Sequence, residues 1–547
     1  MININLYSVI YKSPFDITGE KSILDLPAEP DKVYLFQSHE ASKFAVIYKD
    51  INGWFVNVNG MNYGPYEVAL PVFFSPDGQK YFFWGQKTKK WYLNASGIEK
   101  EYSVMSAAQP VISENSKSYG FIGYDISKEM GSLMPGEEQT GSVLPYFVVV
   151  NGKTAGEFET AEGLELSEDG NEYAFIKKVT VKKKEEVLPA KKEEPAEEKE
   201  TQKSKNSASY MQERLKKLQA NLNKLDEEKN KPEEPAVIET YLSINGKEMG
   251  PVDNVVFLKS VNNEWVLVAK KGKYQLYRGN MDAGFVKTPL QVADGEQLAQ
   301  FAISEDGSKY GYLTSKEDGQ ATVYIGNTPV GTYEGAAALK FTPSGKRYSY
   351  IAREKKLYTV YIDGKQINDG KGLKLFDMVA APGVIFSKDE SRYAVMVKGF
   401  GRWYAVVDGK KSDEFKEEKA VGLEFSADGS RYGFITFTPS KKKDNPDVIH
   451  KIVVDGKVVC VSTGVVKGDM MFSPDNSQLV FGKKAVEFDK DGMKSTIFSL
   501  MNGDKELPSK WQSMSPVVFS QEGPRFSVLA YKSKKIFRIV EEILNNK

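Results

Sequence analysis

The residue types that most often carry out catalysis or bind metals are scarce in this chain of 547 residues. It has two histidines, His39 and His450, and one cysteine, Cys460. His39 stands in the turn-like sequence Ser-His-Glu-Ala-Ser, His450 borders a strand, and Cys460 lies in the apolar run Val-Val-Cys-Val. We interpret them as an exposed turn residue, a strand-edge residue and a buried, inert thiol. A single cysteine excludes an internal disulfide framework and a multi-cysteine zinc site.

Two stretches resemble ligand-binding loops without matching them. Residues 364–371, GKQINDGK, contain one residue too many for a phosphate loop, and Gly372 stands where Ser or Thr is required. Residues 489–492, DKDG, resemble the start of a calcium loop but lack its third acidic position and its distal Glu. The sequence also has no Gly-x-Ser-x-Gly nucleophile elbow. We therefore expect no catalytic residue, cofactor or metal, and predict that the protein is not an enzyme.

The overall charge argues against two classes of partner. Lys and Arg together number 74, as do Asp and Glu. A balanced chain lacks the electrostatic attraction that nucleic acids and anionic membranes require. The sequence contains no run of 18 apolar residues, the length that a membrane-spanning helix needs. Its first residues, MININLYSVIYKSPFD, lack the features of a signal peptide. We expect a cytoplasmic protein, with a periplasmic one as the alternative if a signal peptide was removed ahead of Met1.

A short motif recurs along the chain: an apolar residue, then Ser or Thr, then a turn sequence such as Pro-Asp-Gly. The apolar position is occupied by Phe74, Ile112, Leu166, Ile303, Phe341, Phe386, Phe425, Phe472 and Phe519, with weaker copies at Phe36 and Phe257. Many successive copies are 38 to 47 residues apart. Such a period indicates a repeat architecture. The Asp residues of these turns (Asp77, Asp169, Asp306, Asp428 and Asp475) bond to their own backbone, so we assign them to turn conformation and not to acid–base chemistry.

Each repeat predicts four antiparallel strands. The second strand alternates, as in 431–436 (RYGFIT), and the third is apolar and ends in a hairpin sequence such as Asp408-Gly409-Lys410. Four strands in about 40 to 45 residues are typical of a β-propeller blade. The unit resembles the WD40-like "PD40" repeat of TolB-type propellers, which has a similar Ser-Pro-Asp-Gly turn between its first two strands. The resemblance implies the fold and favours protein–protein contact, and it carries over no functional residue because the shared residues are turn formers.

The number of copies predicts the domain organisation. Eleven copies exceed a typical ring of 4–8 blades. We therefore predict two tandem all-β propellers of about five and six blades, residues 1–295 and 296–547, with one large ring as the alternative. The last copy lacks an outer strand. In a single ring the run Ile4–Ile10 could supply it, and in two rings the strand near Gly284–Lys287 could do so.

Four insertions are predicted to emerge on one face of the blades. Residues 124–145, 179–238, 437–449 and 482–494 all fall between a second and a third strand. The largest begins with a Lys/Glu/Pro tract predicted to be disordered. A helix over about 209–230 follows, with an apolar heptad stripe formed by Met211, Leu215, Leu218, Leu222 and Leu225. Three heptads are marginal alone, so this stripe could pair with a partner helix, with its own copy, or with a groove on its own propeller.

Three tryptophans, Trp54, Trp91 and Trp403, each open a third strand. We expect them to pack between blades, with an edge available to a ligand on the face that carries the insertions. Together with the heptad stripe they are the candidate partner-binding residues. The sequence thus favours a non-enzymatic protein–protein interaction scaffold. The alternatives are a periplasmic, TolB-like binding protein and a propeller enzyme or small-ligand receptor that uses a central channel.

Overall fold

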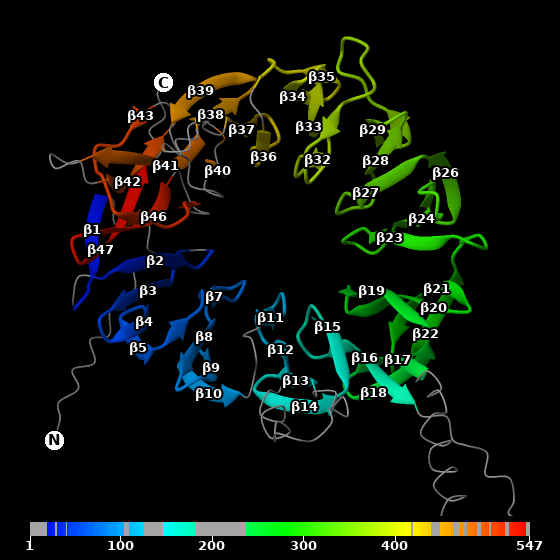
Figure 1. Cartoon of the computed structure of the whole chain (residues 1–547), viewed down its shortest axis with the longest axis horizontal. Helices are drawn as coiled ribbons and strands as arrows, with labels where there is room; N and C mark the ends of the chain where they lie inside the picture. The colour runs from blue at the N-terminus through cyan, green and yellow to red at the C-terminus, as the bar shows by residue number, and fades with distance from the viewer. Residues whose placement is uncertain are drawn as a thin grey trace, which may run out of the picture.

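The computed structural model describes residues 19–27, 30–39, 41–102, 109–124, 146–181, 237–416, 419–438, 449–462, 471–473, 476, 479–488, 494–502, 505–519 and 525–542. Strands make up the regular structure of these residues, and they form eleven antiparallel sheets. Figure 1 shows the sheets arranged around one central opening, with each sheet edge-on to it. The prediction of an all-β propeller is confirmed. The heptad stripe and the helix predicted over 209–230 lie outside the described residues.

The sheets are numbered here as blades 1 to 11 in chain order, starting at Lys32. The first strand of each blade lies nearest the opening (Figure 1). These inner strands are β2 (Lys32–Gln37), β7 (Phe73–Phe74), β11 (Val111–Ile112), β15 (Thr160–Leu166), β19 (Asn254–Val261), β23 (Gln297–Ile303), β27 (Gly335–Phe341), β32 (Ile385–Phe386), β36 (Lys419–Phe425), β40 (Met471–Phe472) and β45 (Val518–Phe519). In three blades a further short strand pairs with the same neighbour: β6 (Val68–Ala69), β31 (Met378–Val379) and β44 (Ser513–Met514).

The remaining strands follow outward from the opening. The second strands are β3 (Phe44–Asp50), β8 (Tyr81–Lys87), β12 (Tyr119–Tyr124), β16 (Tyr173–Val181), β20 (Glu264–Lys271), β24 (Tyr310–Ser315), β28 (Tyr348–Glu354), β33 (Tyr393–Gly399), β37 (Tyr432–Thr438), β41 (Leu479–Phe488) and β46 (Arg525–Lys532). The third strands are β4 (Gly53–Val58), β9 (Lys90–Ala95), β13 (Tyr146–Val150), β17 (Val237–Ile244), β21 (Lys273–Asn280), β25 (Ala321–Ile325), β29 (Leu357–Ile362), β34 (Arg402–Val407), β38 (Ile449–Val454), β42 (Lys494–Asn502) and β47 (Lys535–Glu542). The outer strands are β5 (Met61–Tyr66), β10 (Ile98–Tyr102), β14 (Lys153–Phe158), β18 (Lys247–Val252), β22 (Gly284–Pro289), β26 (Thr328–Tyr333), β30 (Lys365–Gln366), β35 (Lys410–Lys411), β39 (Lys457–Ser462), β43 (Lys505–Glu506) and β1 (Gly19–Asp25).

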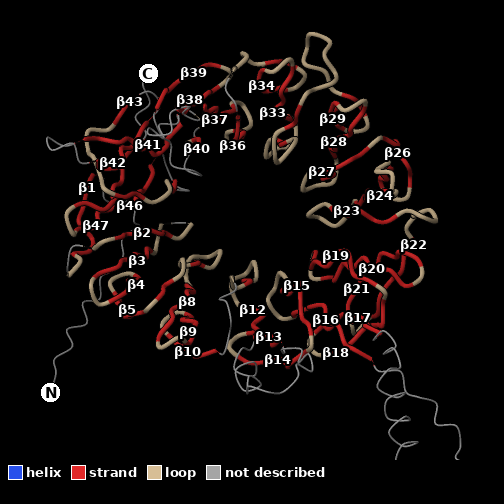
Figure 2. The backbone as a smooth tube through the Cα atoms, in the orientation of Figure 1, coloured by secondary structure: helices blue, strands red, loops and turns tan. Residues whose placement is uncertain are grey.

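The strands of each blade follow one another outward from the opening (Figure 2), and this position explains how deeply each is buried. Second strands such as β8, Tyr-Phe-Phe-Trp-Gly-Gln-Lys, are buried over five consecutive residues because both faces of the sheet pack against neighbouring blades. Outer strands such as β5 expose most of their residues to solvent. The hydrophobic core is therefore a series of separate clusters, one between each pair of neighbours. Trp403 of blade 8, for example, packs with Phe434 of blade 9.

The blades follow one another in a single ring, which was the alternative to two tandem propellers. Blades 5 and 6, on either side of residue 295, share a core in which Val261 and Tyr274 pack with Leu298 and Phe301. Blades 1 and 11 share another, built by strands from opposite ends of the chain. The division at 295/296 has no counterpart in this arrangement. The reason is that packing between neighbouring blades sets the angle at which they meet, and the number of repeats does not reveal that angle.

The last blade is completed by the N-terminal strand β1, which pairs antiparallel with β47 from Gly19–Val540 to Asp25–Lys535. The expectation that Ile4–Ile10 would supply this strand is thereby corrected. The other candidate, β22, is the outer strand of its own blade 5. Leu26, 5% exposed, directly follows β1 and packs with residues of blades 1 and 11. A closure that joins both chain ends removes an unpaired edge from the sheet.

All four predicted insertions are shorter than expected. Tyr124 belongs to β12, and Phe437, Thr438 and Ile449 belong to β37 and β38. Strands β16 and β17 continue to the pair Val181–Val237, so both ends of the 179–238 segment are strand. Residues 482–488 and 494 likewise belong to the β41–β42 ladder, which runs to Phe488–Lys494. Strand ladders extend while cross-strand pairing remains favourable, and this depends on the partner strand more than on local composition. The segments that remain between second and third strands are 125–145, 182–236, 439–448 and 489–493, all outside the described residues.

An arginine joins neighbouring blades in the same way three times. In blade 8, Arg392 Nε donates to Asp408 Oδ2 at 2.7 Å, and Nη1 donates to the carbonyls of Gly429 and Ser430 in blade 9. The guanidinium also lies 5.4 Å from the ring centre of Phe425. Arg347 and Arg431 pair similarly with hairpin aspartates of blades 7 and 9 and reach the following blade. The planar guanidinium suits this multiple role because its donors point in fixed directions.

We expect Arg392→Ala to lower the free energy of unfolding by about 2 kcal/mol, because it removes two hydrogen bonds between blades together with an ion pair. Urea denaturation followed by tryptophan fluorescence measures this loss. Arg392→Lys keeps the positive charge but loses the planar arrangement of donors. It should therefore retain less than half of the stability that Arg392→Ala removes. The control is Arg402→Ala, which removes an exposed pair with Glu414 and should change stability by less than about 0.5 kcal/mol. Equal effects of Arg392→Ala and Arg402→Ala would contradict this role.

Candidate functional site

The recurring Ser-x-Asp turns place a hydroxyl beside a carboxylate, an arrangement that could activate a nucleophile. In blade 2, Ser75 Oγ donates to Asp77 Oδ1 at 2.5 Å and accepts the amide of Lys80. Ser75 is 2% exposed. The same bond recurs in other blades, at Ser167–Asp169, Ser304–Asp306, Ser387–Asp389 and Ser426–Asp428. A buried hydroxyl whose proton is bound to the turn carboxylate is not available as a nucleophile.

The pKa values of these aspartates agree with a conformational role. Hydrogen bonds from Ser387 and Ser391 lower the pKa of Asp389 to about 2. Those from Ser75 and Ser167 hold the pKa of Asp77 and Asp169 below the usual value. A carboxylate that is ionised at all physiological pH values serves as an acceptor and not as a proton donor. The assignment of these residues to turn conformation is consistent with this geometry, with Asp475 outside the described residues.

The turn glycines place neighbouring blades in close contact. Gly429 has a φ of 71°, and a Cβ atom at this position would lie 2.7 Å from Cβ of Ser387 in blade 8. Both the left-handed backbone and the close approach require glycine. The face of the ring that carries these turns is thus built for contact between blades.

His39 lies in blade 1, whereas His450 and Cys460 lie on the paired strands β38 and β39 of blade 9. His39 is an exposed turn residue of blade 1. His450 of blade 9 is half-buried, its ring stacks on Phe437 at 5.6 Å, and burial lowers its pKa. Cys460 is half-buried, and desolvation raises the pKa of its thiol. Within the described ranges no group of three His, Cys, Asp or Glu side chains could hold a metal ion.

The predicted tryptophans hold equivalent positions in three blades. Trp403 is 5% exposed and belongs to the core between blades 8 and 9. Trp54 is half-buried in blade 1 and stacks on Tyr34, with ring centres 6.1 Å apart. Trp91 is half-buried in blade 2 and packs against the cluster between blades 2 and 3. The packing role is therefore seen at all three, whereas a role in partner binding stays a prediction.

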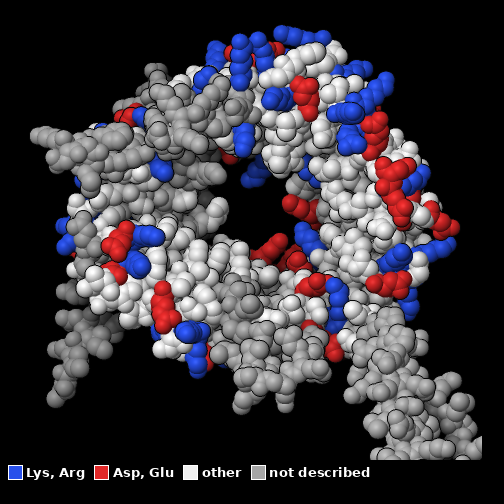
Figure 3. Space-filling view, viewed as in Figure 1, with Lys and Arg blue, Asp and Glu red and all other residues white. Residues whose placement is uncertain are grey.

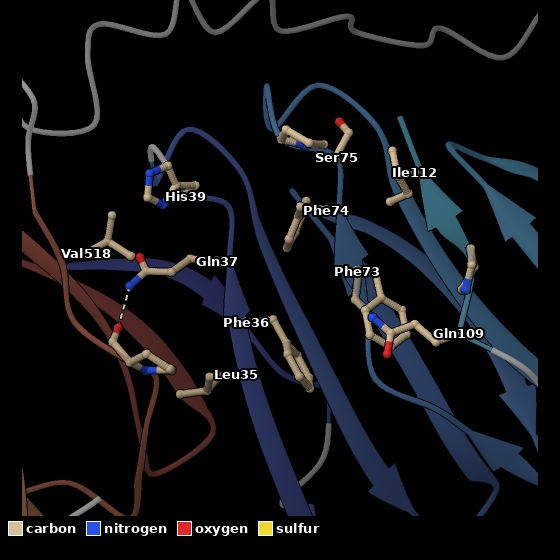
Figure 4. Close-up of a pocket in the computed structure, with 14 residues that line it drawn as sticks. Leu35, Phe36, Gln37, His39, Phe73, Phe74, Ser75, Gln109, Ile112 and Val518 are labelled. Atoms are coloured by element: carbon tan, nitrogen blue, oxygen red, sulfur yellow. Dashed lines mark hydrogen bonds between the residues drawn. The ribbon is translucent and has the colours of Figure 1, made fainter. Parts of the chain in front are cut away.

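A hollow of about 510 Å³ lies in the ring where the inner strands of blades 11, 1, 2 and 3 meet. Figure 4 shows Phe36, Phe73, Phe74, Ile112 and Val518 around it. Each of these side chains is half-buried. Buried residues just behind them on the same strands, Leu35 and Val72, complete its apolar lining.

The polar groups of this hollow are few. Gln37 Nε2 donates to the carbonyls of Pro516 at 2.7 Å and Ser527 at 3.1 Å, so its amide joins blade 1 to blade 11 (Figure 4). His39 and Gln109 are exposed at the edge of the hollow. Among the described residues, the lining contains no carboxylate that could orient His39. This arrangement can hold an apolar group, and the described part of its lining has no acid–base pair.

Sequence reasoning missed this hollow, although the aligned repeats contain a signal for it. The residue two positions before the motif Ser or Thr is Phe36 in blade 1 and Phe73 in blade 2. The same position holds Glu165, Lys340 and Glu424 in blades 4, 7 and 9. Figure 3 shows uncharged atoms on the part of the opening formed by β2 and β7, and charged side chains farther round. One side of the inner wall is thus apolar, and the opposite side contains ionisable groups.

Burial shifts the pKa values of these inner-wall groups. Desolvation raises the pKa of Glu165, an effect opposed by Lys259 of blade 5, and lowers the pKa of Lys340. It raises the pKa of Glu424 to about 7. Atom Oε1 of Glu424 accepts no hydrogen bond from any residue that the structure describes.

Comparisons with known proteins add little to this geometry. The sequence matches no family model and no curated protein. Among solved structures, it is similar to a prolyl endopeptidase at 10% identity and a TM-score of 0.30, covering 80% of this chain and 54% of that one. It is also similar to the Dos1 propeller at 9% identity and a TM-score of 0.26 (55% and 85%), and to the Cps50 (Swd1) β-propeller domain of Myceliophteria thermophila at 8% and 0.21 (52% and 98%). With TM-scores of this size, the propeller assignment depends on the strand pairing of this chain itself.

Proposed function

We propose that this protein is a non-enzymatic scaffold that binds another protein. The observation that supports this best is the apolar hollow where blades 11, 1, 2 and 3 meet. Its volume of about 510 Å³ is enough for one or two large side chains. Buried aromatic and aliphatic anchors in such hollows supply most of the affinity of many protein interfaces.

The polar groups of the hollow favour binding over catalysis. The amide of Gln37 is occupied by the contact between blades 1 and 11, and the hydroxyl of Ser75 is occupied by Asp77. A ligand would therefore be held by apolar contact, with His39 and Gln109 available at the edge. A catalytic site would require a nucleophile or acid beside a positioned base.

Several finer features belong to the same proposal. The insertion helix, with Met211, Leu215, Leu218, Leu222 and Leu225, would add a second contact with a partner helix or mediate self-association. The turn sequences favour the TolB type among propellers. We propose a cytoplasmic location, and a periplasmic one if the open reading frame begins with a signal peptide. The described residues include no helix long and apolar enough to cross a membrane.

The test compares partner capture by variants of the intact protein. In a pull-down from native extract, His39→Glu combined with Gln109→Glu places two charges at the edge of the hollow without altering the core. We expect the recovery of a specific partner to fall at least tenfold. The reason is that an apolar anchor entering the hollow would remove water from the introduced carboxylates. A second variant, with residues 182–236 replaced by a Gly/Ser loop so that β16 and β17 stay intact, tests the insertion in the same way.

The matched control is Gln320→Glu, an exposed position in blade 6, which should retain the partner. Thermal denaturation checks that all variants fold. If only the loop replacement fails to recover the partner, the binding site lies in the insertion and not in the hollow. Retention of the same proteins by all variants would overturn the proposal.

A further inference from the structure

A second cavity of about 510 Å³ lies between blades 2 and 3 and is lined by residues of β10 and of the turn between β13 and β14. Its floor is formed by Phe82, Leu93 and Tyr102, all of which are buried. Ile98 of β10 contributes to the lining although 75% of its surface is exposed. A large apolar side chain left in solvent beside a preformed cleft is typical of a binding surface.

Three lysines, Lys80, Lys100 and Lys117, line the same cleft, and none of the other described residues that line it carries a carboxylate. Lys80 Nζ donates to the carbonyl of Lys117 at 2.8 Å, and Lys100 Nζ donates to the carbonyl of Gly152 at 2.7 Å. Each of these bonds uses one of the three hydrogens of an ammonium group. The remaining hydrogens of both groups are left for an anionic ligand. This concentration of positive charge is local, since the net charge of the whole chain is zero.

Lys80 and Lys117 help to lower the pKa of Asp77 and Asp169, so each lies near a turn carboxylate. The repeats explain why Lys80 nevertheless forms no ion pair with a hairpin carboxylate. Lys80 precedes the second strand of its blade, the position that Arg347, Arg392 and Arg431 occupy in blades 7, 8 and 9. Each of those arginines pairs with an aspartate of the hairpin between the third and fourth strands. The hairpin residue is Ser96 in blade 2, where its hydroxyl accepts the amide of Tyr81. The carboxylate that neutralises the cation elsewhere is therefore replaced by a neutral group.

The hairpin residue of blade 3 is also neutral, since the amide oxygen of Asn151 accepts the amide of Tyr119. Ser118 stands at the arginine position of that blade and accepts a hydrogen bond from the Asn151 side chain, so Lys117 lies one residue before that position. The neighbouring acidic residues are occupied elsewhere. Glu99 and Glu101 flank Lys100 in β10, but strand alternation places them on the other face, where they pair with Lys87 and Lys90. Asp77, in the turn before Lys80, accepts hydrogen bonds from Ser75 and from the amide of Gln79.

We propose that the cleft between blades 2 and 3 binds an acidic peptide segment of a partner protein. One apolar side chain of the peptide lies on the floor, against Leu93 and Tyr102. Its neighbouring carboxylates bind Lys80, Lys100 and Lys117. The apolar floor favours a peptide over a nucleic acid, whose affinity would depend mainly on many phosphate contacts along an extended basic surface. This site is separate from the inner-wall hollow, so either one can fail without the other.

The test uses a fluorescein-labelled peptide, Asp-Glu-Glu-Leu-Phe-Glu-Asp-Glu, titrated with the intact protein and followed by fluorescence anisotropy. We expect saturable binding that weakens as salt rises, because exposed charges are screened. Two comparison peptides separate the contributions. In the first comparison peptide, Lys replaces every acidic residue. In the second, Ser replaces both Leu and Phe. Both should bind at least tenfold more weakly.

Lys100→Glu combined with Lys117→Glu should weaken binding of the acidic peptide at least tenfold. Both positions are exposed, so the fold should tolerate the change. The matched control, Lys365→Glu with Lys410→Glu, changes the net charge equally at exposed hairpin positions of blades 7 and 8 and should leave binding unchanged.

Three outcomes would overturn the proposal. The first is no binding by the unaltered protein, or equal weakening by both double variants. The second is equal binding of the peptide that lacks Leu and Phe. The third is tighter binding of a twenty-nucleotide polythymidine or of phosphatidylserine vesicles, lost in the Lys100/Lys117 variant, which would assign the cleft to nucleic acid or to a membrane surface.

Discussion

Removal of residues 1–26 is expected to open the ring and cause the largest loss of stability among simple truncations. This deletion takes away β1, which supplies the outer strand of blade 11, and Leu26, which packs between blades 1 and 11. The lost hydrogen bonds and the exposed leucine site together predict a fall of roughly 3–5 kcal/mol in the free energy of unfolding. The bare edge of β47 should also promote association. Urea denaturation and size-exclusion chromatography measure the two effects.

The matched control is removal of residues 1–18, which leaves β1 in place. This shorter truncation should keep the midpoint of unfolding within a degree or two of the full chain. A synthetic peptide of residues 19–27 should restore part of the stability of the longer truncation by adding the strand in trans. If both truncations behave alike, β1 does not close the ring in solution.

Replacement of Glu424 by Gln is expected to stabilise the protein by about 3 kcal/mol at pH 8, because burial raises the pKa of this carboxyl from 4.5 to about 7. The folded chain binds a proton at Glu424 in a pH range where the unfolded chain has released it. Stability therefore falls as the pH rises from about 4.5 through about 7 and levels off above that. Gln is neutral like the protonated acid and removes this dependence.

The difference between the variant and the parent should shrink to less than about 1 kcal/mol at pH 5. Urea denaturation at pH 5, 6, 7 and 8 gives the profile. Glu305→Gln, at an exposed turn position of blade 6, is the control and should show the same profile as the parent. A stabilisation independent of pH, or none at pH 8, would mean that water or a charged group reaches the carboxylate. A buried carboxyl that weakens the fold at neutral pH is also a candidate for function.

Local sequence was sufficient to predict the elements of each blade. Ser75 and Asp77 were assigned to a turn because a short side chain can bond to its own backbone, and the hydrogen bond between them is local. Hairpins such as Asp408-Gly409 follow from the same kind of preference, with Asp408 at a φ of 49°. These interactions join residues fewer than about six positions apart, and a single sequence contains that information.

The sites were less predictable because they are assembled from different blades. Phe36, Phe73 and Val518 line one hollow although they come from both ends of the chain. The cleft of Lys80, Lys100 and Lys117 requires the side of blade 2 to face blade 3, and Ser96 and Asn151 stand there at the position that holds aspartate in blades 7, 8 and 9. That comparison between copies was possible from the sequence, but its meaning depends on which side chains the packing brings together.

The sequence by itself therefore determined the four-stranded repeat, the turn chemistry and the number of blades, since each depends on interactions within about 45 residues. The tertiary structure decided how the blades close, which strand completes the last one, and where cavities form. Closure depends on the angle between neighbouring sheets and on a strand pair between Gly19–Asp25 and residues more than 500 positions away. Such long-range contacts are set by the fit of buried surfaces, which local preferences do not encode.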